Sequence, residues 1–112
     1  MLKLRNTGTV SISTGTIAAS GSYTTEAMDC AGLEGFFSLQ WLVVGDGTMK
    51  AEVLVSNDGD TFFDIDDDIA SGKTAGSGMA AFDVTVCNFM KLKFTETGTS
   101  ESIAVTGRLR AK

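Results

Sequence analysis

Apolar and polar side chains alternate with a period of two residues along most of this chain, and this rhythm constrains its fold more than any other feature. The clearest example is residues 36–44, where Phe37, Leu39, Trp41 and Val43 share one parity. A β-strand sends successive side chains to opposite faces, whereas an amphipathic helix needs a period near 3.6 residues. We therefore expect strands, with these four side chains in the core.

The alternating stretches are short, and Gly, Asn, Asp and Ser residues separate them. Turn residues at intervals of about 8–12 residues are typical of β-sandwiches and jelly rolls. The sequence predicts one domain over residues 1–112, an all-β, antiparallel β-sandwich that is jelly-roll-like, with about eight or nine short strands. The expected strands cover residues 9–13, 16–18, 23–28, 36–44, 49–56, 61–65, 82–86, 90–95 and 103–110.

Two regions lack a clear strand pattern. Residues 26–33 have two interpretations, the end of a strand or a single helical turn that Gly32 and Gly35 would shorten. Residues 66–78 are rich in Asp, Gly and Ser and show no periodicity. We expect residues 66–78 to form a mobile connection that crosses from one sheet to the other.

Composition excludes several classes of partner. Hydrophobic residues make up 43% of the 112-residue chain and charged residues 21%, which is the balance of a folded globular domain. The net charge is −5 and no basic run offsets it, so we expect no nucleic-acid partner. No stretch approaches the ~20 apolar residues that span a bilayer, and residues 1–6 lack the apolar centre of a secretory signal. We expect no membrane partner and synthesis in the cytosol.

Histidine is missing, and a Ser–Lys or carboxylate mechanism is the only catalytic chemistry that the composition leaves open. The chain has no histidine, so the common general base at neutral pH and every imidazole-based triad are absent. Cys30 and Cys87 are too far apart in sequence to resemble a zinc knuckle. They could meet across the sandwich, but in a reducing compartment they are better interpreted as two small buried thiols. We expect no enzyme activity, no catalytic residues and no cofactor.

Acidic residues gather between positions 58 and 68. Asp58, Asp60, Asp64 and Asp66 are weak candidates for calcium ligands, because Ca²⁺ takes six to eight oxygen ligands. The spacing is not that of an EF-hand. The simpler interpretation is turn chemistry in the Asn-Asp-Gly segment at 57–59 and a solvated loop end after it.

Several apolar residues fall on faces that should be exposed to solvent. Phe36 and Leu42 have the outward parity of their strand, and Phe62 and Phe63 are adjacent, so one of the two must point outward. These four residues are our candidates for an interface, because apolar side chains gathered on an outer face are typical of a surface covered by a partner. The Thr- and Ser-rich N-terminal strands, with few charges, are candidates for edge pairing between subunits.

Four segments stand out together. The first three follow a recurring plan of an aromatic-containing strand, a strand that ends in Ser-x-Asp-Gly before an aromatic residue, and a penultimate strand of alternating apolar residues, and the fourth follows after a Gly/Thr/Ser turn. They are residues 35–41 (GFFSLQW), 49–62 (MKAEVLVSNDGDTF), 89–95 (FMKLKFT) and 103–109 (IAVTGRL). In this plan the chain resembles small phage and prophage virion structural proteins of the β-sandwich type, over residues 25–112. It departs from their pattern because Lys91 and Lys93 stand where an arginine is usual.

The resemblance implies a structural role in capsid decoration, head completion or a tail. It implies that the partners are further copies of the chain and other virion proteins. It also implies that the protein is made in the host cytoplasm, is located in the virion and has no catalytic residues. The alternative is a carbohydrate- or ligand-binding module. An exposed Trp41 beside Gln40 would favour sugar binding, whereas a large symmetric interface would favour assembly.

Overall fold

The computed structural model describes residues 8–84 and 87–111, and for residues 66 and 67 it describes the backbone alone. This part of the chain forms nine strands and no helix, so it contains no helix that is long and apolar enough to cross a membrane. The strands are β1 (Thr9–Ile17), β2 (Ser22–Thr24), β3 (Met28–Asp29), β4 (Phe36–Val44), β5 (Met49–Ser56), β6 (Phe63–Lys73), β7 (Gly76–Asp83), β8 (Phe89–Glu96) and β9 (Ile103–Ala111).

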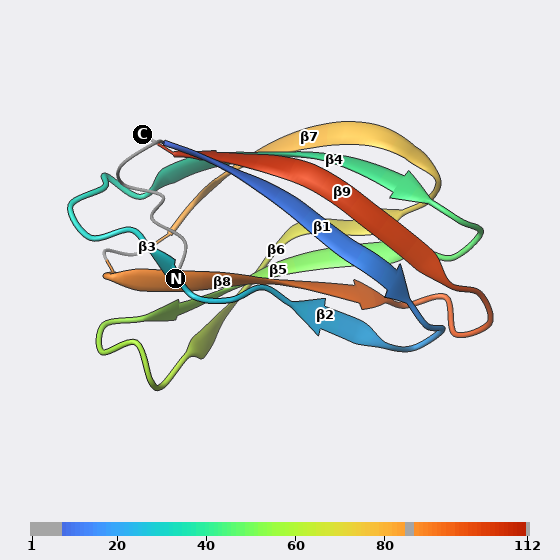
Figure 1. Ribbon diagram of the computed structural model, residues 1–112, viewed down its shortest axis with the longest axis horizontal. Coiled ribbons are helices and arrows are strands. Elements are labelled where there is room, and N and C mark those ends of the chain that lie inside the picture. Colours follow the sequence, from blue (N-terminus) through green and yellow to red (C-terminus); the bar gives the residue numbers. More distant parts are fainter. Residues whose placement is uncertain (1–7, 85–86, 112) are drawn as a thin grey trace.

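The strands make two antiparallel sheets that stack face to face (Figure 1). The β4 sheet has the order β1-β9-β4-β7, and the β5 sheet has the order β2-β8-β5-β6, with the short β3 also paired to β8. Most neighbours within a sheet are not consecutive in sequence, because most connections cross from one sheet to the other. The predicted fold class, an all-β antiparallel sandwich, is confirmed.

The core lies between the sheets and contains the side chains that the alternation assigned to it. Trp41 is 5% exposed, and Leu39 and Val43 are buried beside it. Two strands of the β5 sheet each contribute a row of buried side chains on the opposite side of the core. The rows are Met49, Ala51, Val53 and Val55 on β5, and Met90, Leu92 and Phe94 on β8. Period-two alternation therefore located the interior of both sheets.

Two glycines flank Trp41 on the neighbouring strands, one against its indole and one against the backbone of β4. Gly78 on β7 and Gly107 on β9 are its register partners in the two neighbouring strands. A Cβ atom at Gly78 would lie 2.5 Å from Trp41 Cζ2, and one at Gly107 would lie 2.5 Å from the carbonyl oxygen of Gln40. Both distances are shorter than a carbon atom allows, so glycine is required on each side of the tryptophan.

Residues 66–78 do not form a mobile connection, and that prediction is wrong. β6 continues to Lys73 and β7 starts at Gly76, so the crossing from one sheet to the other takes only Thr74 and Ala75. The period of two is lost in this region because β6 pairs with β5 through three register irregularities, and each bulge reverses the face of the residues that follow it. The expected strand at 82–86 corresponds to the end of β7, and residues 85 and 86 lie outside the described part of the chain.

The N-terminal third also differs from expectation. The two short strands expected at 9–13 and 16–18 form one strand, β1, with an irregularity between Ser13 and Thr16. Thr14 lies in this bulge, where its buried Oγ1 accepts a hydrogen bond from the backbone N–H of Val105 at 3.0 Å. The helical alternative for residues 26–33 is wrong, because residues 28 and 29 form β3.

Three loops meet at one end of the sandwich around the carboxylate of Glu96, which is only 1% exposed. Its Oε1 accepts the backbone N–H groups of Ser20 at 3.0 Å and Thr99 at 2.8 Å, and its Oε2 accepts those of Thr48 at 2.9 Å and Gly98 at 2.6 Å. These backbone hydrogen bonds, that from Thr48 foremost, lower the pKa of Glu96 from 4.5 to about 2. The charged carboxylate thus fastens the β1–β2, β4–β5 and β8–β9 loops together.

Candidate functional site

The outer faces of the two sheets differ in chemistry. The β5 sheet exposes charged side chains, and Lys50 Nζ lies 3.7 Å from both Glu52 Oε2 and Asp68 Oδ1. Lys91 Nζ lies 4.3 Å from the centre of the Phe62 ring, which is half-buried. Solvated charges of this kind are typical of a free surface, and they disfavour a dry interface.

The outer face of the β4 sheet carries a group of exposed apolar side chains instead. We name this group the β4 apolar row, although one member belongs to β7. Its members are Phe36 (52% exposed), Leu42 (45%), Val44 (57%) and Met79 (65%). Phe36 and Leu42 are thus exposed as expected, and their role in an interface stays a prediction. Met79, opposite Gln40 in the register, was missed because its surroundings consist of Gly, Ser and Ala.

The β7 strand at the edge of this sheet has no local feature that would block pairing. Among the described residues β7 pairs with β4 alone, in an unbroken register from Phe36 opposite Asp83 to Val43 opposite Gly76. It carries no charge before Asp83. Natural edge strands are usually protected by bulges, charges or proline. β1, which the sequence suggested for edge pairing, is also an edge strand, but its bulge at Thr14 interrupts it.

A shallow hollow of about 630 Å³ lies on the same outer face. Amide, hydroxyl and guanidinium groups surround it beside one apolar side chain, a mixture that suits a polar ligand. Trp41 also borders the hollow, but its 5% exposure leaves no open aromatic platform there. The lining residues are Gln40, Trp41, Leu42, Ser77, Thr106, Gly107 and Arg108.

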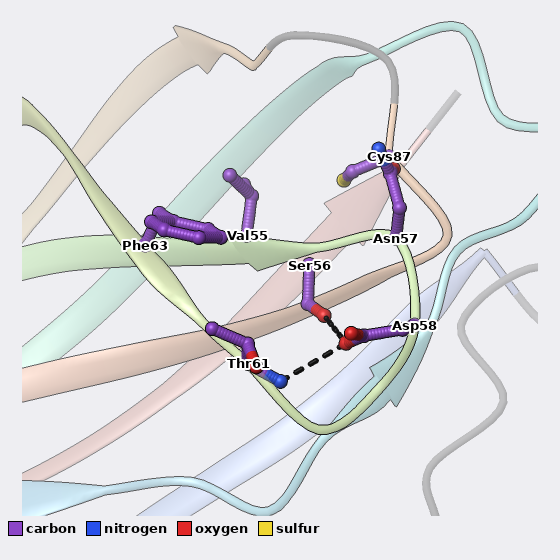
Figure 2. Close-up of a pocket in the computed structure, with 7 residues that line it drawn as sticks. All are labelled: Val55, Ser56, Asn57, Asp58, Thr61, Phe63 and Cys87. Carbon is purple, nitrogen blue, oxygen red and sulfur yellow. Dashed lines mark hydrogen bonds between the residues drawn. The ribbon is translucent and has the colours of Figure 1, made fainter.

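A second hollow, of about 310 Å³, opens where β5 and β6 meet the start of β8. Figure 2 shows Phe63 beside its register partner Val55 on one side of this hollow and Cys87 on the other. Phe63 is 64% exposed, and it is the more exposed member of the Phe62–Phe63 pair. The lining residues are Val55, Ser56, Asn57, Asp58, Thr61, Phe63 and Cys87.

Asp58 acts as the cap of the β5–β6 turn. Its Oδ1 accepts hydrogen bonds from the hydroxyl of Ser56 at 2.9 Å and from the backbone N–H of Thr61 at 2.9 Å (Figure 2). It also accepts one from the backbone N–H of Asp60 at 2.8 Å. These hydrogen bonds, that from Thr61 foremost, lower the pKa of Asp58 below its ordinary value. This geometry is the turn chemistry that the Asn-Asp-Gly segment predicted.

The acidic residues proposed as calcium ligands do not assemble into a site in the described part of the chain, where no three acidic, histidine or cysteine side chains converge. Asp58, Asp60 and Asp64 lie within that part. The side chain of the fourth candidate, Asp66, lies outside it.

Cys30 and Cys87 are both buried, and their Sγ atoms lie 3.6 Å apart. They meet within the β5 sheet and not across the sandwich, because Cys30 follows β3 and Cys87 precedes β8, the strand with which β3 pairs. The hydrogen bond between the two thiols raises the pKa of Cys30, with burial adding to the effect, and it lowers the pKa of Cys87 to about 7.

No protein-family model matches the chain, and no curated protein sequence matches it. Solved structures do resemble it. The enzymatically active domain of tailspike protein 4 of bacteriophage CBA120 matches 94% of this chain with a TM-score of 0.60 and 12% identity, although the chain spans only 19% of that protein. The CBM22-1 xylan-binding domain from Paenibacillus barcinonensis matches 93% of this chain, and 85% of its own length is covered, with a TM-score of 0.54 and 9% identity.

A structure of infectious bursal disease virus is similar as well, with a TM-score of 0.53 and 11% identity over 92% of this chain and 31% of the viral chain. At such identities the likeness establishes the fold alone. It includes viral and carbohydrate-binding proteins on equal terms, and a β-sandwich of this kind serves many functions.

Proposed function

We propose that this chain is a non-enzymatic assembly module of a phage-type virion, whose copies pair through strand β7 and the β4 apolar row. The observation that carries the proposal is the edge of β7. A regular eight-residue edge strand presents unpaired N–H and C=O groups, which form a template for another strand. The exposed side chains of Met79 and Leu42 lie beside this edge and add apolar area to the contact.

The chemistry of β7 fits a second copy of the chain as its occupant. The protein carries a net charge of −5, which would make most of its surface repel another copy. β7 has no charge between Gly76 and Phe82. An antiparallel two-fold pairing centred on Met79 would place the two Met79 side chains opposite each other and join two four-stranded sheets into one.

The virion setting draws support from two directions. The resemblance of the sequence to small phage virion proteins agrees with the presence of a phage tailspike domain and a viral structure among the proteins of similar fold. In this role the protein is made in the host cytoplasm, is located in the virion and contacts other virion proteins, as capsid decoration, head completion or a tail component. Genes for virion proteins are expected beside its own.

Light scattering of the purified protein tests the pairing. We expect a dimer or larger symmetric oligomer at high micromolar concentration, and we expect Met79→Lys to weaken its association by about tenfold or more, because the substitution places a charge at the centre of the contact. Phe63→Lys is the matched control, since Phe63 is equally exposed on the edge strand of the other sheet. A wild-type monomer at that concentration, or equal effects of the two variants, would contradict the pairing.

A carbohydrate-binding module is the second candidate, and the hollow at Gln40 and Arg108 favours it. Amide and guanidinium groups beside hydroxyls suit sugar hydroxyls, and one protein of similar fold is a xylan-binding domain. Titration calorimetry with xylan oligosaccharides separates the candidates. Binding that Arg108→Ala abolishes and Met79→Lys spares would favour the sugar over assembly.

A further inference from the structure

We propose that Cys30 and Cys87 form a reversible intramolecular disulfide, so that the hollow beside Phe63 is a site of oxidation by low-molecular-weight disulfides. The inference is independent of the assembly proposal. It starts from the position of the two sulfur atoms, which are 3.6 Å apart in a chain where the two residues are 57 positions apart.

The backbone around the two cysteines is held in place by hydrogen bonds. The N–H of Cys30 donates to the carbonyl oxygen of Asn88 at 2.9 Å, which extends the β3–β8 pairing by one residue beyond Asp29 and Phe89. The N–H of Asn88 donates in turn to the carbonyl oxygen of Ser56 at 3.1 Å. Cys30 and Cys87 therefore lie just beyond the paired ends of β3 and β8. The sulfur atoms must approach only from 3.6 Å to about 2.05 Å to make the bond.

The two thiols differ in their access to solvent. Cys87 is 8% exposed and lines the 310 Å³ hollow with Phe63 and Val55, which gives an oxidant a route toward its sulfur. Cys30 is 2% exposed, and it does not line that hollow. The lowered pKa of Cys87, about 7, provides a fraction of thiolate at neutral pH, and the thiolate is the form that attacks a disulfide.

The reaction balances with oxidised glutathione as the oxidant. The thiolate of Cys87 attacks one sulfur of glutathione disulfide, which breaks that S–S bond, releases one glutathione thiolate and forms a mixed disulfide. Cys30 then loses its proton to solvent and attacks the sulfur of Cys87, which releases the second glutathione. The two cysteine thiols are oxidised to one disulfide, and glutathione disulfide is reduced to two thiols.

Treatment of the folded protein with oxidised glutathione tests the proposal. We expect both free thiols to disappear, the intact mass of each chain to fall by two hydrogen atoms, and peptide mapping to find Cys30 joined to Cys87 of the same chain. The disulfide closes a long loop in the unfolded state, so the Tm should rise by on the order of 10 °C and return to its starting value on reduction.

Two variants assign the order of attack. Cys30→Ser should stop at the mixed disulfide and gain the mass of one glutathionyl group, whereas Cys87→Ser should gain none while folded. If a serine variant does not fold, as judged by circular dichroism, the alanine variant at the same position replaces it. The wild-type peptide map tests the disulfide even if no variant folds. Wild-type protein that keeps both thiols, or that forms only links between chains, would overturn the proposal.

Discussion

The carboxylate of Glu96 accepts the backbone N–H of Thr48 at 2.9 Å, although 48 positions separate the two residues. Three further N–H groups, from Ser20, Gly98 and Thr99, complete the set. This buried carboxylate holds the β1–β2, β4–β5 and β8–β9 loops together through four hydrogen bonds. Its structural role is similar to that of a disulfide that links two loops.

Replacement of this carboxylate should destabilise the protein. Glu96→Gln removes the charge and offers an NH₂ group to N–H donors that need an acceptor, so part of the set loses its partner. We expect the Tm to fall by about 5 °C or more. Differential scanning calorimetry measures it, and Glu101→Gln, an exposed glutamate on the β8–β9 loop, serves as the control with little change.

Glu96 also makes stability depend on pH in the acid range. Its pKa is about 2 in the folded protein against an ordinary value of 4.5. A lowered pKa stabilises the folded state wherever the carboxylate is charged in both states, so the contribution is complete above about pH 4.5 and is lost as the pH falls toward 2. Denaturant midpoints measured from pH 6 to pH 2 should fall less steeply for Glu96→Gln than for wild type. Parallel curves for the two proteins would contradict this assignment.

Gly78 should not tolerate a side chain. Gly78→Ala would place a Cβ atom 2.5 Å from Trp41 Cζ2, and the indole would have to move within a packed core, at a cost of about 1–3 kcal/mol. Urea unfolding followed by the fluorescence of Trp41, the single tryptophan, measures the loss. Ser77→Ala, at the exposed neighbouring position, is the control and should change the free energy of unfolding by less than about 0.5 kcal/mol.

Calcium should leave the Tm unchanged. Asp58 Oδ1 already accepts three hydrogen bonds within the β5–β6 turn, and no group of three potential ligands converges in the described residues. A ligand that binds the folded state alone must stabilise it. Thermal melts in millimolar CaCl₂ and in excess chelator should therefore coincide, and a Tm that rises with calcium concentration would restore the four aspartates as ligands.

The sequence predicted the structure best where the pairing between neighbouring strands is regular. Leu39 and Val43 lie in the core as their parity predicted, because β4 pairs on both sides without a bulge. It was least informative along β6 and β7. Bulges break the period of two in β6, and β7 consists largely of Gly, Ser and Ala, whose small side chains give no apolar signal.

The candidate site could be predicted in part. Phe36 and Leu42 were identified because an apolar residue at outward parity is unusual, whereas Met79 depended on recognising β7. The burial of Glu96 could have been predicted from the sequence, because Glu96 has the same inward parity as Leu92 and Phe94. The parity of residues along one strand cannot predict that three loops approach that carboxylate. It also cannot predict that Cys30 and Cys87 lie close together. Both depend on how strands far apart in sequence are paired.

Strand β8 is thus secured at its two ends, by Glu96 at its last residue and by the cysteine pair just before its first. At its middle, the N–H of Leu92 donates to Thr25 Oγ1 at 3.0 Å and the carbonyl of Leu92 accepts the N–H of Thr25 at 2.9 Å. In hydrogen–deuterium exchange, the amides of β8 should therefore be the last to take up deuterium, because they exchange only when the whole domain unfolds. The amides of Thr74 and Ala75, in the turn between β6 and β7, should exchange early through local opening.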